Sequence, residues 1–233
     1  MGAIILGLDL VSRNAVCFDL DGVLVDTEPI WERVRRRFAE QHGGRWTSDL
    51  QVRMMGVRTR DWSTALDDAT GGRLGPNAIA SAVIDDLAAE YRDHLPVIDG
   101  AAVTVRRLAN EAVLGLVSGS PQRLIELVLE LMALTDAFKV VMSADEVEKG
   151  KPSPDPYLGL ARGLRTPPSS CVAVEDSANG IASAHAAGMA VIAIPRGEHR
   201  PRADILGRAD VVLDDISELT PEMVRRAAAR AKR

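Results

Sequence analysis

The chain has 233 residues, enough for one sizeable core or for one α/β domain with a small inserted lobe. Hydrophobic residues make up 46% and charged residues 26%, a balance typical of a globular protein rather than a disordered or fibrous one. The formal net charge is −5 and the aromatic content 3%, so neither a broad basic surface nor a base-stacking platform is available. We therefore expect no nucleic acid partner.

The cysteines and the first residues do not indicate an exported or membrane-bound protein. Cys17 and Cys171 are too few for a disulfide framework, and each lies in an apolar run typical of small buried side chains. The apolar stretch 3–8 is far shorter than the ~20 residues that a membrane span needs, and no basic segment precedes it. We expect a cytoplasmic protein without a membrane-spanning segment.

Short apolar runs alternate with longer helical patterns along the chain, which is typical of βαβ units and a parallel sheet. The predicted strands are Ala15–Leu20, Val113–Val117, Lys139–Met142, Cys171–Val174 and Ala190–Ile194, with Val211–Leu213 as a sixth candidate. Residues Ala3–Leu10 are also strand-like but have no predicted place in the sheet. The pattern predicts an α/β fold with a doubly wound, Rossmann-like parallel sheet.

More than 90 residues separate the first two predicted strands, and this stretch has a helical pattern. The predicted helices are Pro29–His42, Thr59–Thr70 and Asn77–His94. We therefore predict a core domain of residues 1–26 and 95–233 with an inserted α-helical cap domain of residues 27–94. Because open α/β sheets bind ligands at the carboxyl ends of their strands, the cap is a candidate lid. The alternative is a distal decoration without a role in binding.

Two acidic residues follow the first predicted strand. Asp19 and Asp21 are two positions apart, so in an extended chain their side chains point to the same side, about 6–7 Å apart. One carboxylate can then reach a reacting centre while the other reaches a leaving group. Gly22 allows a sharp turn, and an Asp-Gly turn without a chemical role is the alternative interpretation.

Polar loops also follow the second and third predicted strands. Ser118 and Gly119 offer a hydroxyl and free backbone amides before a helix, which is typical of an anion site and equally of a plain helix cap. The loop 148–156 is rich in proline and glycine, and a lysine held there can bind phosphate as a fixed cation. Lys149 and Lys151 both qualify, and solvated surface lysines are the alternative.

A second acidic pair, Glu175 and Asp176, closes the fourth predicted strand just before a helix. If the two acidic pairs converge, four negative charges face one lysine, which is unfavourable unless a divalent cation binds or a carboxyl keeps its proton. Oxygen ligands suit Mg²⁺, whereas no Cys/His set has the spacing of a zinc site. A Ser-His-Asp hydrolase is disfavoured because no G-x-S-x-G elbow occurs.

Four segments in chain order carry a family resemblance. DLDGVLVDTEP at residues 19–29 resembles the first motif of the haloacid dehalogenase (HAD) superfamily, in particular of its capped small-metabolite phosphatases and β-phosphoglucomutase-like members. Ser118 after VLGLV resembles the second motif, and Lys151 in GKPSPDPY the third. The Glu175–Asp176 pair in VEDSANG resembles the fourth. The likeness runs from about residue 15 to the C-terminal region.

The resemblance implies a role for each acidic residue. Asp19 would be the nucleophile that forms an aspartyl-phosphate, and Asp21 would protonate the leaving group and then activate water. Mg²⁺ would be held by Asp19, by the backbone carbonyl of Asp21 and by Asp176. Glu175 would be a further ligand or lie directly behind the ligands.

The resemblance also implies that Ser118, the Gly119 amide and Lys151 bind the phosphoryl oxygens. The expected function is that of a Mg²⁺-dependent phosphatase acting on small phosphorylated metabolites, with sugar phosphates as the expected class. A phosphosugar mutase of the β-phosphoglucomutase type is the first alternative. A signalling module with a long-lived phospho-aspartate is more distant, and a dehalogenase is disfavoured because it has no need of clustered metal ligands.

The cap region departs from the mutase pattern. Mutases of this group carry a histidine five residues after the acid of the Asp-Thr pair, and here that position is Trp31. This difference favours plain hydrolysis. Arg58 and Arg60 are candidates to face a second anionic group of the substrate, and a solvated helix start is the alternative.

Overall fold

Six parallel strands form the central sheet in this computed structural model, which describes residues 15–196 and 200–231. The strands lie in the order β3-β2-β1-β4-β5-β6, so the first strand is in the middle. They are β1 (Ala15–Phe18), β2 (Val113–Ser118), β3 (Val140–Ser143), β4 (Cys171–Glu175), β5 (Ala190–Ala193) and β6 (Val211–Val212). This order confirms the predicted doubly wound α/β fold. The strand-like residues Ala3–Leu10 lie outside the described residues.

Helices connect all of the strands. Between β1 and β2 lie α1 (Glu28–Gln41), α2 (Ser48–Met54), α3 (Thr59–Ala69), α4 (Pro76–Asp93) and α5 (Ala101–Ala109). The later helices are α6 (Gln122–Leu131), η1 (Ala144–Glu146), α7 (Asp155–Leu164), η2 (Pro168–Ser170), α8 (Ala178–Ala186), α9 (Ala203–Leu206), η3 (Ile216–Glu218) and α10 (Pro221–Arg230). Within the described residues, no helix combines the length and apolarity needed to span a membrane.

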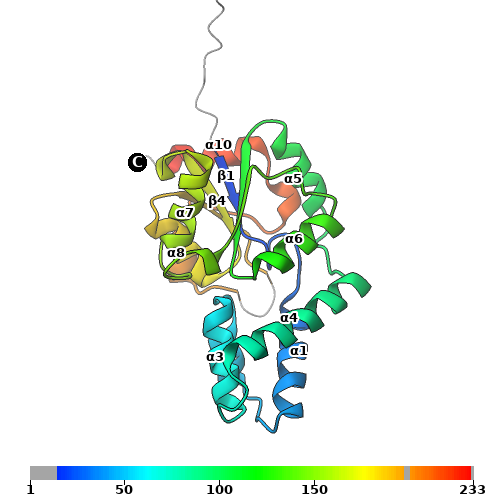
Figure 1. Cartoon of the computed structure of the whole chain (residues 1–233). Coiled ribbons are helices and arrows are strands. Elements are labelled where there is room, and N and C mark those ends of the chain that lie inside the picture. The colour runs from blue at the N-terminus through cyan, green and yellow to red at the C-terminus, as the bar shows by residue number, and fades with distance from the viewer. Residues whose placement is uncertain (1–14, 197–199, 232–233) are drawn as a thin grey trace, which may run out of the picture.

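The sheet is buried on both faces, which explains why its strands are continuous apolar runs rather than alternating ones. Val16 and Phe18 of β1 belong to a core cluster shared with α5, α6 and α10. Ala15 and Cys17 point the other way, into a cluster shared with α7 and α8. Figure 1 shows α7 and α8 on one side of the strands and α5 and α6 on the other. Both cysteines are buried and free, as predicted.

The helices α1 to α4 pack on one another beyond the end of β1 (Figure 1). Their core contains Trp31 and Trp62, whose rings meet edge to face with centroids 5.7 Å apart. The sequence pattern does not predict α2, because its seven residues are too few to show a helical period. These helices fall within the range 27–94, and the independence of this segment as a cap domain stays a prediction.

One core leucine tests the packing between α7 and the sheet. Leu160 is fully buried and lies directly on Gly115 of β2. We expect Leu160→Ala to lower the free energy of unfolding by about 2–5 kcal/mol, because the removed side chain leaves a cavity. The matched control is Leu131→Ala, since Leu131 is 44% exposed at the end of α6, and a change there should stay near about 0.5 kcal/mol. Urea unfolding of both variants measures this, and equal losses would contradict the packing described.

Candidate active site

The predicted motifs meet where β1, β2 and β4 end. β1 lies between the other two strands, and its last residue, Phe18, is level with Leu116 of β2 and Val174 of β4. The backbone amide of Asp19 then donates a hydrogen bond to the Val174 carbonyl at 3.0 Å. Parallel register therefore brings side chains more than a hundred residues apart in sequence to one edge of the sheet.

Lys151 is the cation at this edge. Its ammonium group donates hydrogen bonds to Asp19 Oδ1 at 2.8 Å and to Glu175 Oε1 at 2.6 Å. Burial disfavours its charge, but the two carboxylates raise the pKa of Lys151 above its usual value, so the group stays protonated. Lys149 is exposed on the same loop. Loop composition left the two lysines equivalent, and the structure brings Lys151, the residue to which the resemblance points, to this edge of the sheet.

Glu175 is completely buried and is held by more groups than the sequence indicates. The Tyr157 hydroxyl donates to Oε1 at 2.8 Å, and the Ser177 hydroxyl donates to Oε2 at 3.1 Å. A Cβ on Gly180 would collide with the carboxylate, so a glycine is needed there. Sequence reasoning missed Tyr157, and its only local signal is its place in the first turn of the helix after the lysine loop.

Asp21 points into a different group of side chains. Its Oδ1 accepts a hydrogen bond from the Thr27 hydroxyl at 2.5 Å, and its Oδ2 accepts from the hydroxyls of Ser118 and Ser120 at 2.8 Å each. Hydroxyl groups both donate and accept, so they can hold this carboxyl in either protonation state. The sequence analysis singled out Ser118 but not Thr27 or Ser120.

Three carboxylates converge closely enough to hold a metal ion. Asp19, Glu175 and Asp176 each offer an oxygen, and these oxygens lie within 4.8 Å of one another. Asp176 Oδ1 is buried without a hydrogen-bond partner in the described part of the chain. Burial, together with the charges of Glu175 and Asp19, raises the pKa of Asp176 well above its ordinary value. An all-oxygen site with excess negative charge fits a hard divalent cation.

The tight turn after β1 creates room for this cluster. Gly22 has a φ of 81°, and a Cβ there would collide with the Asp176 carboxylate. The Asp21 side chain is not among the three converging carboxylates. The resemblance assigns its backbone carbonyl to the metal, and that contact stays a prediction.

The two arginines proposed for a second anion lie in different surroundings. Arg58 donates to the backbone carbonyls of Val147 at 3.1 Å and Glu148 at 2.6 Å, and it forms an ion pair with Asp61. Its guanidinium therefore links the start of α3 to the loop that leads to Lys151. Arg60 is exposed on α3. A substrate contact by either residue stays a prediction.

The connection between α2 and α3 lies close to the predicted phosphate loop. A Cβ on Gly119 would lie only 3.2 Å from the Gly56 carbonyl oxygen and 3.4 Å from that of Val57. Backbone from the α2–α3 connection therefore passes directly over the Ser118–Gly119 segment. A side chain at position 119 would crowd this passage.

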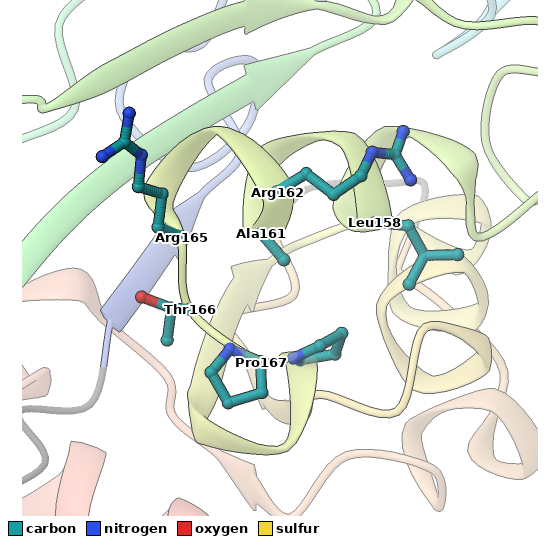
Figure 2. A pocket seen from close by; sticks show the side chains of 7 residues that line it. Leu158, Ala161, Arg162, Arg165, Thr166 and Pro167 are labelled. Carbon is teal, nitrogen blue, oxygen red and sulfur yellow. The ribbon is translucent and has the colours of Figure 1, made fainter.

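A surface hollow of about 350 Å³ lies away from these residues, near the C-terminal end of α7. Figure 2 shows Arg162 and Arg165 pointing in different directions beside it, above Thr166 and Pro167. No predicted site residue lines this hollow. It is therefore not the candidate active site.

Comparison with known proteins identifies the family. Residues 14–188 match the family model for the haloacid dehalogenase-like hydrolases. Hexitol phosphatase B from Escherichia coli is 33% identical over 216 residues, which cover 88% of this chain and 94% of that protein. Beta-phosphoglucomutase from Bacillus subtilis is 30% identical over 222 residues, covering 91% and 93%. The crystal structure of beta-phosphoglucomutase from Clostridium difficile superposes with a TM-score of 0.79 at 20% identity, covering 93% and 97%.

The chain therefore belongs to the haloacid dehalogenase-like hydrolase family and is an enzyme of that class. This confirms the resemblance drawn from the four motifs. It also supports the enzymatic interpretation of the aspartates over the signalling one.

The raised pKa of one candidate ligand predicts how stability depends on pH. Burial raises the pKa of Asp19 from 3.8 to about 7, against the opposing charge of Lys151. The folded protein thus keeps a proton that the unfolded chain loses at lower pH, so this stabilisation is complete below pH ~4 and is lost as the pH rises through ~7.

We therefore expect the unfolding free energy of the EDTA-treated protein to fall between pH ~4 and ~7, measured by urea unfolding. Added Mg²⁺ should stabilise the protein more at pH ~8 than at pH ~5, because protons compete for the ligand oxygens. Equal stabilisation by Mg²⁺ at both pH values would contradict the assignment of these carboxylates.

Proposed function

We propose that this protein is a Mg²⁺-dependent phosphatase that hydrolyses small phosphorylated metabolites, with sugar phosphates as its substrate class. The observation that carries the proposal is that two acids, two residues apart in sequence, lie in different surroundings. Asp19 joins Lys151 in the metal-binding cluster, whereas Asp21 is held separately among hydroxyls. The similarity to hexitol phosphatase B supports the sugar phosphate class. We expect the protein to act in the cytoplasm.

The geometry suits a two-step transfer. An oxygen of Asp19 attacks the phosphorus of the monoester, the bond to the leaving oxygen breaks, and Asp21 gives that oxygen its proton. Asp21 then takes a proton from water as the water oxygen attacks the phosphorus of the aspartyl-phosphate. The bond from Asp19 to phosphorus breaks, which releases inorganic phosphate and restores the carboxylate.

Positive charge is needed where the phosphoryl group sits. Lys151 provides a fixed cation, and the Ser118 hydroxyl and the Gly119 amide lie in the loop beside it. Mg²⁺ bound by Asp19 and Asp176 would neutralise phosphoryl oxygens and hold them against the nucleophile. Glu175 is saturated by Lys151, Tyr157 and Ser177, so we assign it to positioning the lysine rather than to direct ligation.

The nucleophile is tested by its amide analogue. Asp19→Asn keeps the shape of the side chain but removes the attacking carboxylate, so phosphate release from p-nitrophenyl phosphate and a panel of sugar phosphates should fall by at least about 10⁴-fold. The control is Asp136→Asn, because Asp136 lies exposed on the loop before β3. Activity in the Asp19 variant close to that of the wild type would refute the assignment, provided both proteins show the same melting temperature.

A phosphosugar mutase is the second candidate, favoured by the similarity to beta-phosphoglucomutase from Bacillus subtilis. Trp31 argues against it. This residue is 4% exposed and packs against Trp62 and the Arg35 guanidinium, so it offers no proton-transfer group at the position where the mutases have a histidine.

We expect β-glucose 1-phosphate with a bisphosphate primer to yield inorganic phosphate and little glucose 6-phosphate. Chromatography of the sugar phosphates together with a phosphate assay measures both products. Isomer formed faster than phosphate would favour the mutase.

A further inference from the structure

A cluster of polar side chains lies inside the cap and takes no part in the chemistry described above. We define the cap polar cluster as Glu28, Arg35, Gln51 and Tyr91. Gln51 of α2 donates a hydrogen bond from Nε2 to Glu28 Oε1 at the start of α1, at 2.8 Å. The Arg35 guanidinium lies against the rings of both Trp31 and Trp62, with its central carbon 4.2 Å and 5.0 Å from their centroids.

The cluster has unused hydrogen-bonding capacity. Arg35 is 3% exposed, Gln51 6% and Tyr91 2%. Even so, Arg35 Nε, Gln51 Oε1 and the Tyr91 hydroxyl have no hydrogen-bond partner among the residues that the structure describes. A buried polar atom without a partner costs about 1–3 kcal/mol, so three of them together call for an explanation.

Two connections place the cluster beside the active site. Thr27, the residue before Glu28, donates a hydrogen bond from its hydroxyl to Asp21 Oδ1. On the other side, Arg35 Nη1 donates to the Met54 carbonyl at 3.2 Å, at the end of α2. The chain that follows passes over Gly119 in the phosphate loop. The cluster is therefore joined both to the leaving-group acid and to the segment that covers the phosphate loop.

The position of the cap polar cluster relative to Asp21 determines which part of a substrate would lie near it. Asp21 protonates the leaving oxygen, so the carbon chain attached to that oxygen lies on the Asp21 side of the phosphorus. Burial raises the pKa of Glu28 to about 7, and the nearby charge of Asp21 contributes to this rise. A substrate with several hydroxyls thus carries donors and acceptors toward side chains that have free acceptor and donor atoms.

We propose that Glu28 and Gln51 are specificity-determining residues that bind hydroxyl groups of the substrate's carbon chain. The inference rests on the proposed function and makes it narrower: the preferred substrates are phosphate monoesters of polyhydroxylated chains. Glu28 and the Gln51 carbonyl accept hydrogen bonds from hydroxyls. Arg35, held against the two tryptophan rings, is a positioning residue that holds the end of α2 and balances the charge of Glu28.

The test compares two substrates in the same protein preparation. A hexitol phosphate presents a hydroxylated chain, whereas p-nitrophenyl phosphate presents a ring without hydroxyls. The variants Gln51→Met and Glu28→Gln keep the side-chain size while removing the amide or the charge. The readout is the ratio of the two kcat/KM values, because partial unfolding lowers both values equally and cancels in the ratio.

We expect this ratio to fall by about 10-fold in each variant, the loss that corresponds to one good hydrogen bond. The matched control is Glu32→Gln, since Glu32 lies on the same helix in a surface pair with Arg36, and it should leave the ratio unchanged. An unchanged ratio in both cap variants would overturn the inference, and so would an equal fall in the Glu32 variant. A wild-type protein that hydrolyses neither substrate would overturn the proposed function itself, and the inference with it.

Discussion

The buried contact of Lys151 with Asp19 and Glu175 is the interaction on which the rest of the site depends. Taking three charges out of water is unfavourable by several kcal/mol per ion, and it is tolerated only where the groups satisfy one another in good geometry. Here the lysine joins the loop before α7 to the ends of β1 and β4. Tyr157 and Ser177 complete the hydrogen bonding of Glu175, so the cation has one defined position. Negative charge still exceeds positive charge, which leaves Asp19 and Asp176 to attract a further cation.

The turn after β1 separates the two aspartates into different environments. Asp19 continues the strand into the charged cluster, whereas Asp21 lies beyond the last strand residue and meets three hydroxyl groups. The environment of a carboxyl sets how readily it holds a proton. Because the surroundings differ, one acid can serve as a nucleophile and the other as an acid and base. Gly22 makes this arrangement possible by turning the chain where any side chain would strike Asp176.

In the proposed function, the inserted segment contacts the part of the substrate that lies beyond the phosphate. Thr27 is the first residue of the inserted segment, and its hydroxyl donates a hydrogen bond to Asp21. The start of α1 is therefore held beside the proposed leaving-group acid. Arg58 ties the start of α3 to the lysine loop at a second point. The helices between these points carry buried polar atoms rather than a purely apolar core. An inserted segment joined to the candidate active site at these two points is well placed to select substrates by their hydroxyl groups.

The sequence by itself determined the doubly wound sheet and predicted which side chains would converge at its strand ends. Apolar runs that end in Asp19, Ser118 and Glu175 are local patterns, and parallel register guarantees that strand ends meet. The family resemblance already pointed to Lys151 rather than Lys149, whereas only the tertiary structure brought Tyr157 to Glu175. It also revealed the cap polar cluster, whose members come from separate helices. The physical reason is that the periodicity of apolar residues indicates which side of a helix or strand is buried. The partner of a buried polar atom depends instead on contacts between distant segments, and such contacts produce no periodic pattern in the sequence.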